Sequence, residues 1–342
     1  MSNFPPISLD ESLLARTVQR HMSADNDQPG LCAAVLRNGQ ISALVCCGRA
    51  GMPFSGAPPV EPDTAFRLAS VSKQFTAAAI LILRRRGMLT LEDSVRRHLP
   101  QLPPWAAPMT LRHLLTHTSG VWPYEQIIPE ERTTQLTDVD VLELMAGENR
   151  TRFTAGEKFY YSNTGYALLA NVVERVADCP FPTFLKEAIF DPLAMNNTLA
   201  YVAGGPPVQK RAYGCALREG LWHDADQGLT SAVLGDGGIY TTGPDYALWD
   251  ASISKQTLLP GADWKEAFAP ARDNQGHALP YGLGWRLEQT ADGHDVVYHT
   301  GNTTGFNSCV RRLPRTGVTV LALANRTGTQ THKITRDVLA AM

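Results

Sequence analysis

Two stretches near the start of the chain consist of apolar residues in the short, branched pattern that is typical of β-strands. They cover residues 31–36 and 41–47 and are separated by an Asn-Gly pair, which is a strong signal for a hairpin turn. A second hairpin is predicted near the end, from residues 306–313 and 318–324, and residues 296–298 form a further strand just before it. The pattern therefore predicts β-structure at both ends of the chain.

Helical periodicity flanks these strands at residues 8–22 and 331–342, and the middle of the chain, residues 66–280, is mostly helical with loops rich in Pro and Gly. We therefore expect the first and last segments to pair into one antiparallel sheet covered by the terminal helices. The fold class is then α/β (α+β), in a single domain that spans the whole chain. An α/β part comes from residues 1–65 and 281–342, the helical part is inserted between them, and the functional cleft is expected at their seam.

The charge distribution and the cysteines narrow the function. Of the 342 residues, 31 are Lys or Arg and 33 are Asp or Glu, and neither sign is concentrated in one region. This balance argues against a nucleic-acid partner or a membrane surface. No stretch approaches the roughly 18 apolar residues of a membrane span, and the first six residues lack a signal-peptide pattern, so we expect a cytoplasmic protein. The six cysteines show no zinc spacing and are expected to be free and buried.

A candidate nucleophile lies at the start of a long apolar helical stretch. Ser70 and Lys73 are three residues apart, which places both side chains on one face of a helix. An amine beside a hydroxyl can accept its proton when the amine is neutral, and burial favours that neutral form. The free N–H groups at a helix start would also stabilise an oxyanion beside Ser70. This pair therefore predicts nucleophilic catalysis.

The same Ser-x-x-Lys spacing occurs a second time, at Ser252 and Lys255. About one or two copies are expected by chance in a chain of this length. The second copy falls toward the end of a helical pattern that begins near Asp245 and stops before Pro260. A helix end presents carbonyl groups, which repel an oxyanion. Ser70 is therefore the preferred nucleophile.

Tyr161 and Asn163 form the second candidate element. A tyrosine can pass a proton between the serine and a leaving group when nearby cations stabilise its phenolate. Asn163 can hydrogen-bond to Lys73 or to a substrate carbonyl. The alternative interpretation is an aromatic loop before a helix, with Asn163 as the helix cap. Taken alone, this motif leaves both interpretations open.

The third candidate element, His299-Thr300-Gly301, follows the predicted strand at residues 296–298. A polar or cationic residue, a small hydroxyl residue and a glycine give a strand edge that a substrate backbone can approach closely. Two other basic-Thr-Gly triplets exist. The one that begins at Arg315 forms a hairpin turn, and the one that begins at Arg326 links the last strand to the last helix. The triplet at His299 is therefore preferred.

Two further patterns are assigned no cofactor. His113 and His117 are four residues apart, as in a metal pair on a helix, but no Glu follows His113 and no third ligand is indicated. The Gly-rich run at residues 235–238 lacks the spacing and the preceding strand of a dinucleotide-binding fingerprint. We therefore expect neither a metal nor a cofactor.

In this order, the three candidate elements resemble those of the serine β-lactamase and penicillin-binding-protein family. The resemblance is closest to its class C-like branch of esterases, D-aminopeptidases and amidases. It extends over about residues 60–310. The matching segments are Ser70-Val71-Ser72-Lys73, Tyr161-Ser162-Asn163, His299-Thr300-Gly301, and residues 114–120, 237–242 and 302–306. One such motif is weak evidence, whereas the ordered set is specific.

The resemblance implies a β-lactamase/transpeptidase-like fold that needs no cofactor. It also implies that Ser70 is the nucleophile and that Lys73 and Tyr161 are its proton-transfer partners. The oxyanion hole would be formed by the backbone N–H groups of Ser70 and Asn302. The residues implied in orienting and binding the substrate are Asn163, His299, Thr300, Gly301 and Asn302.

These features predict a serine hydrolase that forms an acyl-enzyme on a small ester, amide or D-amino-acid-containing peptide. Many β-lactamases and transpeptidases have a lysine where this chain has His299, and histidine is often neutral at pH 7. We therefore expect weak or no β-lactamase activity, and any binding of an anionic substrate by His299 should strengthen as the pH falls through about 6.5. The alternatives are an acyltransferase of the same fold, a class C-like β-lactamase and a catalytically silent binding protein.

Overall fold

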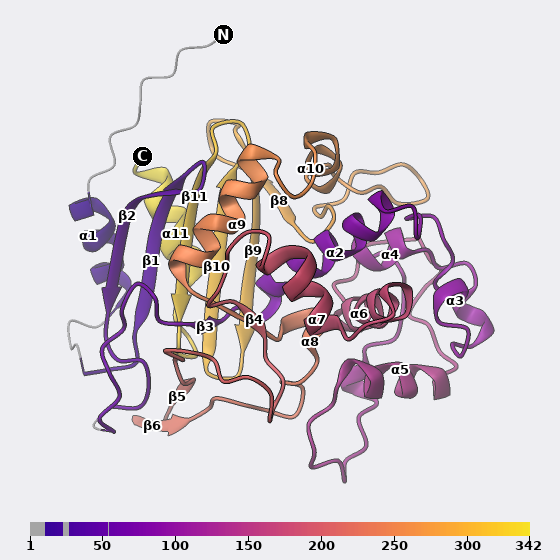
Figure 1. The fold of residues 1–342 in the computed structure, drawn as a ribbon, viewed down its shortest axis with the longest axis horizontal. Helices are drawn as coiled ribbons and strands as arrows, with labels where there is room; N and C mark the ends of the chain where they lie inside the picture. Colours follow the sequence, from indigo (N-terminus) through magenta and orange to yellow (C-terminus); the bar gives the residue numbers. More distant parts are fainter. Residues whose placement is uncertain (1–10, 23–26, 54) are drawn as a thin grey trace.

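The computed structural model describes residues 11–22, 27–53 and 55–342. Its main feature is a six-stranded antiparallel sheet in the order β2-β1-β11-β10-β9-β8 (Figure 1). The strands are β1 (Leu31–Arg37), β2 (Gln40–Cys47), β8 (Arg286–Gln289), β9 (Asp295–Thr303), β10 (Phe306–Leu313) and β11 (Val318–Ala324). Because β1 pairs with β11, the two ends of the chain share one sheet, as predicted.

The turn between β1 and β2 follows from its two central residues. Asn38 and Gly39 both adopt left-handed conformations, with φ angles of 50° and 79°. Asparagine and glycine tolerate this region, and two such residues in succession give a turn whose twist matches that of the strands. A Cβ on Gly39 would also lie 2.2 Å from the Cβ of Ala251, so the neighbouring helix leaves no room for a side chain.

The two faces of the sheet pack against different layers. Leu31 and Val35 of β1 belong to an apolar cluster with residues of α1 (Glu11–His21) and α11 (Thr331–Ala340). Leu36 belongs to the larger core that continues into the helical region. Figure 1 shows α1 and α11 on the outer side of the sheet and α9 on the side that faces the other helices. The alternation along β1 thus separates an outer core from an inner one.

Between β2 and β8 the chain is mostly helical, with two small sheets. Helix α2 (Lys73–Arg85) is buried on all sides from Lys73 to Leu83, as expected for a helix at the centre of a domain. The other helical segments are η1 (Ala69–Ser72), α3 (Val95–His98), η2 (Pro104–Ala106), α4 (Leu111–Leu115), η3 (Tyr124–Gln126), α5 (Asp138–Gly147), α6 (Asn163–Ala177), α7 (Phe181–Leu185), η4 (Lys186–Phe190), α8 (Leu234–Gly237), α9 (Gly243–Lys255) and α10 (Gly261–Ala267). The small sheets join β3 (Phe66–Arg67), β7 (Ile239–Thr241) and β4 (Leu199–Ala200), and β5 (Cys215–Arg218) with β6 (Leu221–Asp224).

The predicted fold class is confirmed, and the differences lie at strand boundaries. Strand β9 continues to Thr303, beyond the predicted end at Tyr298, because its pairing with β10 continues where the apolar pattern stops. Strand β8 was not predicted, since it is a short edge strand whose four residues are all half-buried or exposed. The first helix is described from Glu11, so residues 8–10 of the predicted helix lie outside the described residues.

Candidate active site

Ser70 lies in a tight turn between a strand and a helix. Strand β3 ends at Arg67, and the 3₁₀ turn η1 leads directly into α2. Ala69 has a φ of 49°. This left-handed conformation costs a non-glycine residue on the order of 1 kcal/mol and persists only where the surroundings fix the backbone. Ser70 is thereby held, half-buried, at the N-terminal side of α2, where the sequence placed it.

Lys73 is the first residue of α2 and is fully buried. Its Nζ lies 3.1 Å from Ser70 Oγ, 2.9 Å from Asn163 Oδ1 and 2.8 Å from the backbone oxygen of Asp236. The oxygens from Asn163 and Asp236 can only accept hydrogen bonds, so they take two of the N–H groups of the amine. The remaining position of the amine faces Ser70, where it can exchange a proton with the hydroxyl.

The orientation of Asn163 is fixed from its other end. Its Nδ2 donates to Glu125 Oε1 at 2.8 Å, which turns Oδ1 toward Lys73. The cap of α6 is Ser162, whose Oγ accepts a hydrogen bond from Gly165 N at 3.3 Å. The alternative interpretation of Asn163 as the helix cap is therefore wrong. Glu125, in η3, is exposed and was not singled out from the sequence.

Tyr161 stands beside the amine of Lys73 and the guanidinium of Arg286. Lys73 Nζ lies 5.1 Å from the centroid of the Tyr161 ring, and the guanidinium carbon of Arg286 lies 4.8 Å from it. Positive charges at this range stabilise negative charge that develops on the phenol oxygen. Arg286 begins β8, and among the described residues no carboxylate forms an ion pair with it. Arg286 is thus a cation of the site that lies outside the three sequence motifs.

Strand β9 offers an unpaired backbone edge beyond Tyr298. Strand β8 pairs with β9 only as far as Tyr298, whereas β10 pairs with it as far as Thr303. Within the described parts of the chain, residues 299–303 therefore have no strand partner on the β8 side. Thr300 is half-buried and Asn302 is exposed. Such an edge can make main-chain hydrogen bonds with an extended substrate.

Gly301 allows β9 to pack closely against the Ser70 turn. A Cβ at this position would lie 2.1 Å from the backbone oxygen of Leu68 and 2.2 Å from Ser308 Oγ. The hydroxyl of Ser308 also donates to that Leu68 oxygen at 2.6 Å. The sequence argument was that glycine lets a substrate approach the strand. In the structure, it is the segment before Ser70 that occupies this space.

The side chain of His299 does not supply a charge for a substrate. It is fully buried, with Nδ1 2.8 Å from the oxygen of Thr300 and Nε2 2.8 Å from the hydroxyl of Tyr281. Because a carbonyl only accepts, Nδ1 carries the proton and Nε2 accepts from Tyr281.

Burial, together with the charges of Lys73 and Arg286, holds the pKa of His299 well below its ordinary value of 6.5. The expectation that His299 binds an anionic substrate more strongly as the pH falls through that value is therefore wrong. Both ring nitrogens are committed within the protein, so the side chain of His299 has no free hydrogen-bonding group for a substrate.

Two buried carboxyl groups lie at α8, one within it and one at the start of α5. Asp236, whose backbone oxygen accepts from Lys73, has a carboxylate that accepts a 3.4 Å hydrogen bond from the Tyr124 hydroxyl. Burial raises the pKa of Asp236 to about 6, although Lys73 opposes this effect. Asp138, at the start of α5, accepts two backbone N–H groups of α8, and burial raises its pKa to about 8. The turn that holds Lys73 is therefore packed around two acids that titrate near neutral pH.

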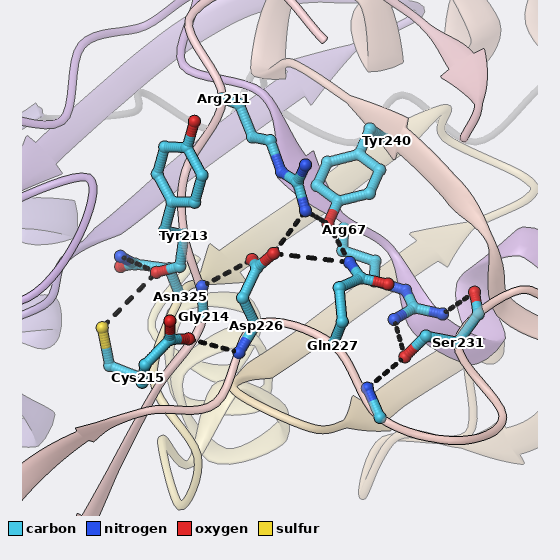
Figure 2. A network of polar contacts seen from close by, with 12 residues as sticks. Arg67, Arg211, Tyr213, Gly214, Cys215, Asp226, Gln227, Ser231, Tyr240 and Asn325 are labelled. Atoms are coloured by element: carbon cyan, nitrogen blue, oxygen red, sulfur yellow. Dashed lines mark hydrogen bonds and ion pairs between the residues drawn. The ribbon is translucent and has the colours of Figure 1, made fainter. Parts of the chain in front are cut away.

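A buried polar network holds the loop that leads into α8 (Figure 2). Arg67 donates to the hydroxyl and the backbone oxygen of Ser231, at 2.7 and 2.8 Å, and to the backbone oxygen of Gly237 at 3.2 Å. Arg211 forms an ion pair with Asp226 at the other end of this loop. Because Arg67 lies on the strand directly before the Ser70 turn, the network fixes this loop relative to Ser70.

The second Ser-x-x-Lys pair and the two other basic-Thr-Gly triplets lie away from the Ser70 site. Ser252 is buried in the last turn of α9, and its hydroxyl donates to the backbone oxygen of Trp249 at 2.7 Å. Lys255 is exposed. The triplet at Arg315 lies in the turn between β10 and β11, and the triplet at Arg326 lies beyond the end of β11. The positions expected for these motifs from the sequence are thus the positions observed.

The described residues contain no group of three or more His, Cys, Asp or Glu side chains that could hold a metal ion. His113 instead closes the start of α4, where its Nδ1 accepts from the backbone N–H of Thr110. All six cysteines are free, as expected, but only Cys32, Cys215 and Cys309 are buried, whereas the other three are half-buried. No helix in the part of the chain that the structure describes has the length and apolar character needed to cross a bilayer.

Sequence reasoning missed several residues of this site. They are His117, Glu125, Asp236, Tyr281 and Arg286. Glu125, Tyr281 and Arg286 lie in segments without a distinctive local pattern and reach the site through contacts over long sequence separations. A signal was present for the other two, because His117 lies in the matching segment at 114–120 and Asp236 lies in the Gly-rich run at 235–238, but neither was assigned a role in the site.

The model of the beta-lactamase family matches residues 14–341 of the chain. The chain belongs to the beta-lactamase family. The family and the fold predicted from the ordered motifs are therefore confirmed.

The chain is similar in sequence and in structure to several named proteins. Penicillin-binding protein 4* of Bacillus subtilis is 30% identical over an alignment of 290 residues, and the match covers 78% of this chain and 62% of that protein. The chain thus spans less than two thirds of the length of this curated relative. The octameric penicillin-binding protein homologue from Pyrococcus abyssi has a TM-score of 0.83 at 23% identity, covering 97% of this chain and 77% of that one. The D-amino acid amidase from Ochrobactrum anthropi has a TM-score of 0.80 at 23% identity, covering 97% and 96%. At these identities the solved structures share the fold.

Proposed function

We propose that this protein hydrolyses small amides, esters or D-amino-acid peptides through an acyl-enzyme on Ser70. The observation that carries the proposal is the environment of Lys73. Its buried amine is held by two oxygens that only accept hydrogen bonds, and its third position faces Ser70 Oγ at 3.1 Å. A group fixed in this way is positioned for proton exchange with the serine, and positioning contributes strongly to catalysis.

The proposed reaction uses the residues in two steps. Ser70 Oγ attacks the substrate carbonyl and gives its proton to Lys73, while the backbone N–H groups of Ser70 and Asn302 stabilise the oxyanion. The bond between the carbonyl carbon and the leaving group then breaks, and the proton passes from Lys73 through Tyr161 to the leaving group. In the second step, water attacks the acyl carbon and gives a proton to Lys73, the bond between that carbon and Ser70 Oγ breaks, and the proton returns to Ser70 as the acid product leaves.

Two charged side chains bear on the choice of substrate. Glu125 is exposed and is joined to Lys73 through Asn163. Arg286 is half-buried beside Tyr161, the proposed donor to the leaving group. A substrate with an ammonium on its acyl side would pair with Glu125, and a carboxylate on its leaving group would pair with Arg286. This arrangement favours amides and short peptides of amino acids over neutral esters.

We further propose that β-lactams are poor substrates. The neutral ring of His299 replaces the cation that many family members use for the carboxylate beside the β-lactam. A charge-assisted hydrogen bond is about twice as strong as a neutral one, so this contact is weakened. The name of one structural relative, a D-amino acid amidase, supports an amide substrate, whereas the name of the curated relative, a penicillin-binding protein, makes β-lactams a necessary part of the test.

A substrate panel with intact-mass detection tests the proposal. The panel contains D-phenylalanine amide, D-alanyl-D-alanine, the two L-enantiomers, p-nitrophenyl acetate and a chromogenic cephalosporin. We expect an acyl adduct on Ser70 and turnover of D-amides or D-peptides, with slow cephalosporin hydrolysis. Addition of an alcohol acceptor separates hydrolysis from acyl transfer, because an acyltransferase would form the ester in preference to the acid. Cephalosporin turnover as fast as that of the best amide would overturn the proposed specificity.

A further inference from the structure

His117 is a buried imidazole directly behind Tyr161 that the proposed reaction does not use. Its ring centroid lies 4.3 Å from that of Tyr161, at an interplanar angle of 38°. The rings of Phe159, Tyr166 and Tyr281 surround it at 5.9, 5.1 and 4.5 Å. Only 1% of His117 is exposed, so the imidazole has no access to solvent or substrate.

Two hydrogen bonds of His117 hold the residues on either side of Tyr161. The backbone oxygen of His117 accepts from Tyr160 N at 2.8 Å, and its Nδ1 accepts from Ser162 N at 3.1 Å. Both contacts are possible because His117 adopts a left-handed conformation, with a φ of 59°. Tyr161 lies between the two residues whose backbone N–H groups are bound in this way.

The tautomer and the charge of His117 follow from these contacts. Since Nδ1 accepts a hydrogen bond, the proton of the neutral ring is on Nε2, which has no hydrogen-bond partner among the described residues. Burial, with the nearby charges of Lys73 and Arg286, holds the pKa of His117 well below its ordinary value. A ring that stays neutral, with its proton enclosed by aromatic side chains, has no partner with which to exchange a proton.

We propose that His117 is a positioning residue that fixes Tyr161 over the Ser70–Lys73 pair. The inference rests on the proposed role of Tyr161 in proton transfer. An unfilled Nε2–H and a left-handed backbone both cost stability, yet a leucine or phenylalanine would fill the same space. What these residues lack is an acceptor for Ser162 N–H. The hydrogen bond that holds Tyr161 in place is therefore the property that requires histidine here.

Two substitutions separate the acceptor from the ring. His117→Asn keeps an acceptor near Nδ1 and tolerates the left-handed backbone, whereas His117→Ala removes both the acceptor and the ring. We expect kcat of His117→Ala to fall about 100-fold and that of His117→Asn about 10-fold, with KM changing less than about threefold in either. His113→Asn, four residues away at the start of α4, is the matched control and should stay within about twofold.

The decisive measurement is His117→Asn in a Tyr161→Phe background. If His117 acts through the hydroxyl of Tyr161, its loss there should shrink to about twofold or less. An equal loss in both backgrounds, or a folded His117→Asn variant that loses as much kcat as His117→Ala, would overturn the proposal. So would the disappearance of an ionisation from the pH–rate profile of His117→Asn, since that would make His117 an acid or base.

Crystal structures of the His117 variants test the positioning role without relying on activity, so this role and the proposed function can fail independently. Should the wild-type protein turn over no member of the panel, the proposed function fails. The positioning role still predicts that the Tyr161 hydroxyl moves away from Ser70 and Lys73 in His117→Ala, and moves less in His117→Asn. A Tyr161 side chain unmoved in both variants would contradict it, whatever the substrate. If His117→Ala does not fold, the position of Tyr161 in His117→Asn decides.

Discussion

The chain contains two turns with the same Ser-x-x-Lys spacing, and only one of them is built as a reactive site. At Ser70, the lysine is buried and held by Asn163 and Asp236, which come from segments far along the chain. At Ser252, the lysine is exposed and the serine hydroxyl donates into its own helix. The spacing alone therefore has no chemical consequence. The difference comes from what distant segments bring to the turn.

The buried aspartates near the two turns, Asp250 and Asp236, also differ in how well their carboxylates are paired. Asp250, beside Ser252, forms a buried ion pair with Arg312 and accepts from the hydroxyl of Thr319. Among the described residues, the carboxylate of Asp236, beside Lys73, has one side-chain hydrogen bond, from the hydroxyl of Tyr124 at 3.4 Å. The carboxylate of Asp250 is neutralised by Arg312 and has a structural role. The other remains poorly paired in a buried site, which is typical of functional rather than structural positions.

The largest expected effect separates the two serines. Ser70→Ala should lower the rate of acyl transfer by at least about 10⁴-fold and abolish labelling by a fluorophosphonate, since it removes the nucleophile. Ser252→Ala should leave both unchanged, because its hydroxyl bonds only to the carbonyl of Trp249. Intact-mass spectrometry after labelling measures both variants. Labelling that persists in Ser70→Ala would refute the assignment, as would its loss in Ser252→Ala.

The next effect tests whether the residues around Ser70 act as a unit. Lys73→Ala and Tyr161→Phe should each lower kcat by about 10²- to 10⁴-fold. Because both serve one proton path, the double variant should lose less than about tenfold beyond the worse single one. Lys255→Ala is the matched control and should have wild-type kcat. Losses that add in full would show two independent functions.

The sequence predicted the parts of this comparison that are local. Both hairpins, the start of α2 near Ser70 and the end of α9 near Ser252 follow from turn residues, apolar periodicity and helix polarity. The sequence did not reveal that His299 is buried, because a strand of alternating polar residues looks the same whichever face is covered. Glu125 and Arg286 were missed for a related reason. Each is an ordinary charged residue until the fold places it beside Asn163 or Tyr161.

A smaller effect concerns these two charges. Glu125→Gln should lower kcat/KM about 10-fold for a D-amino acid amide with a free ammonium, and much less for its N-acetyl derivative. Arg286→Gln should lower kcat/KM by a similar factor for a dipeptide with a free carboxylate, and less for the dipeptide amide. Each variant is thus the control for the other. Equal losses on all four compounds would mean that the charges serve structure rather than recognition.

The smallest effect concerns the stability of the two acid sites at different pH. Burial raises the pKa of Asp236 from 3.8 to about 6, so the folded state holds this proton more tightly than the unfolded state. The stabilisation is fully present below the unfolded pKa and is lost as the pH rises through the folded one. Asp236→Asn carries no ionisable group, so it should gain roughly 1–3 kcal/mol in unfolding free energy relative to wild type between pH 4 and pH 8. Urea unfolding of both proteins at the two pH values measures this difference, in which the titration of all other groups cancels.

Asp250→Asn is the comparison at the second turn: it leaves Arg312 without its buried partner and should be destabilised at both pH values. If the difference between Asp236→Asn and wild type does not change with pH, the carboxyl of Asp236 is already ionised at pH 4, and the contrast between the two acids disappears.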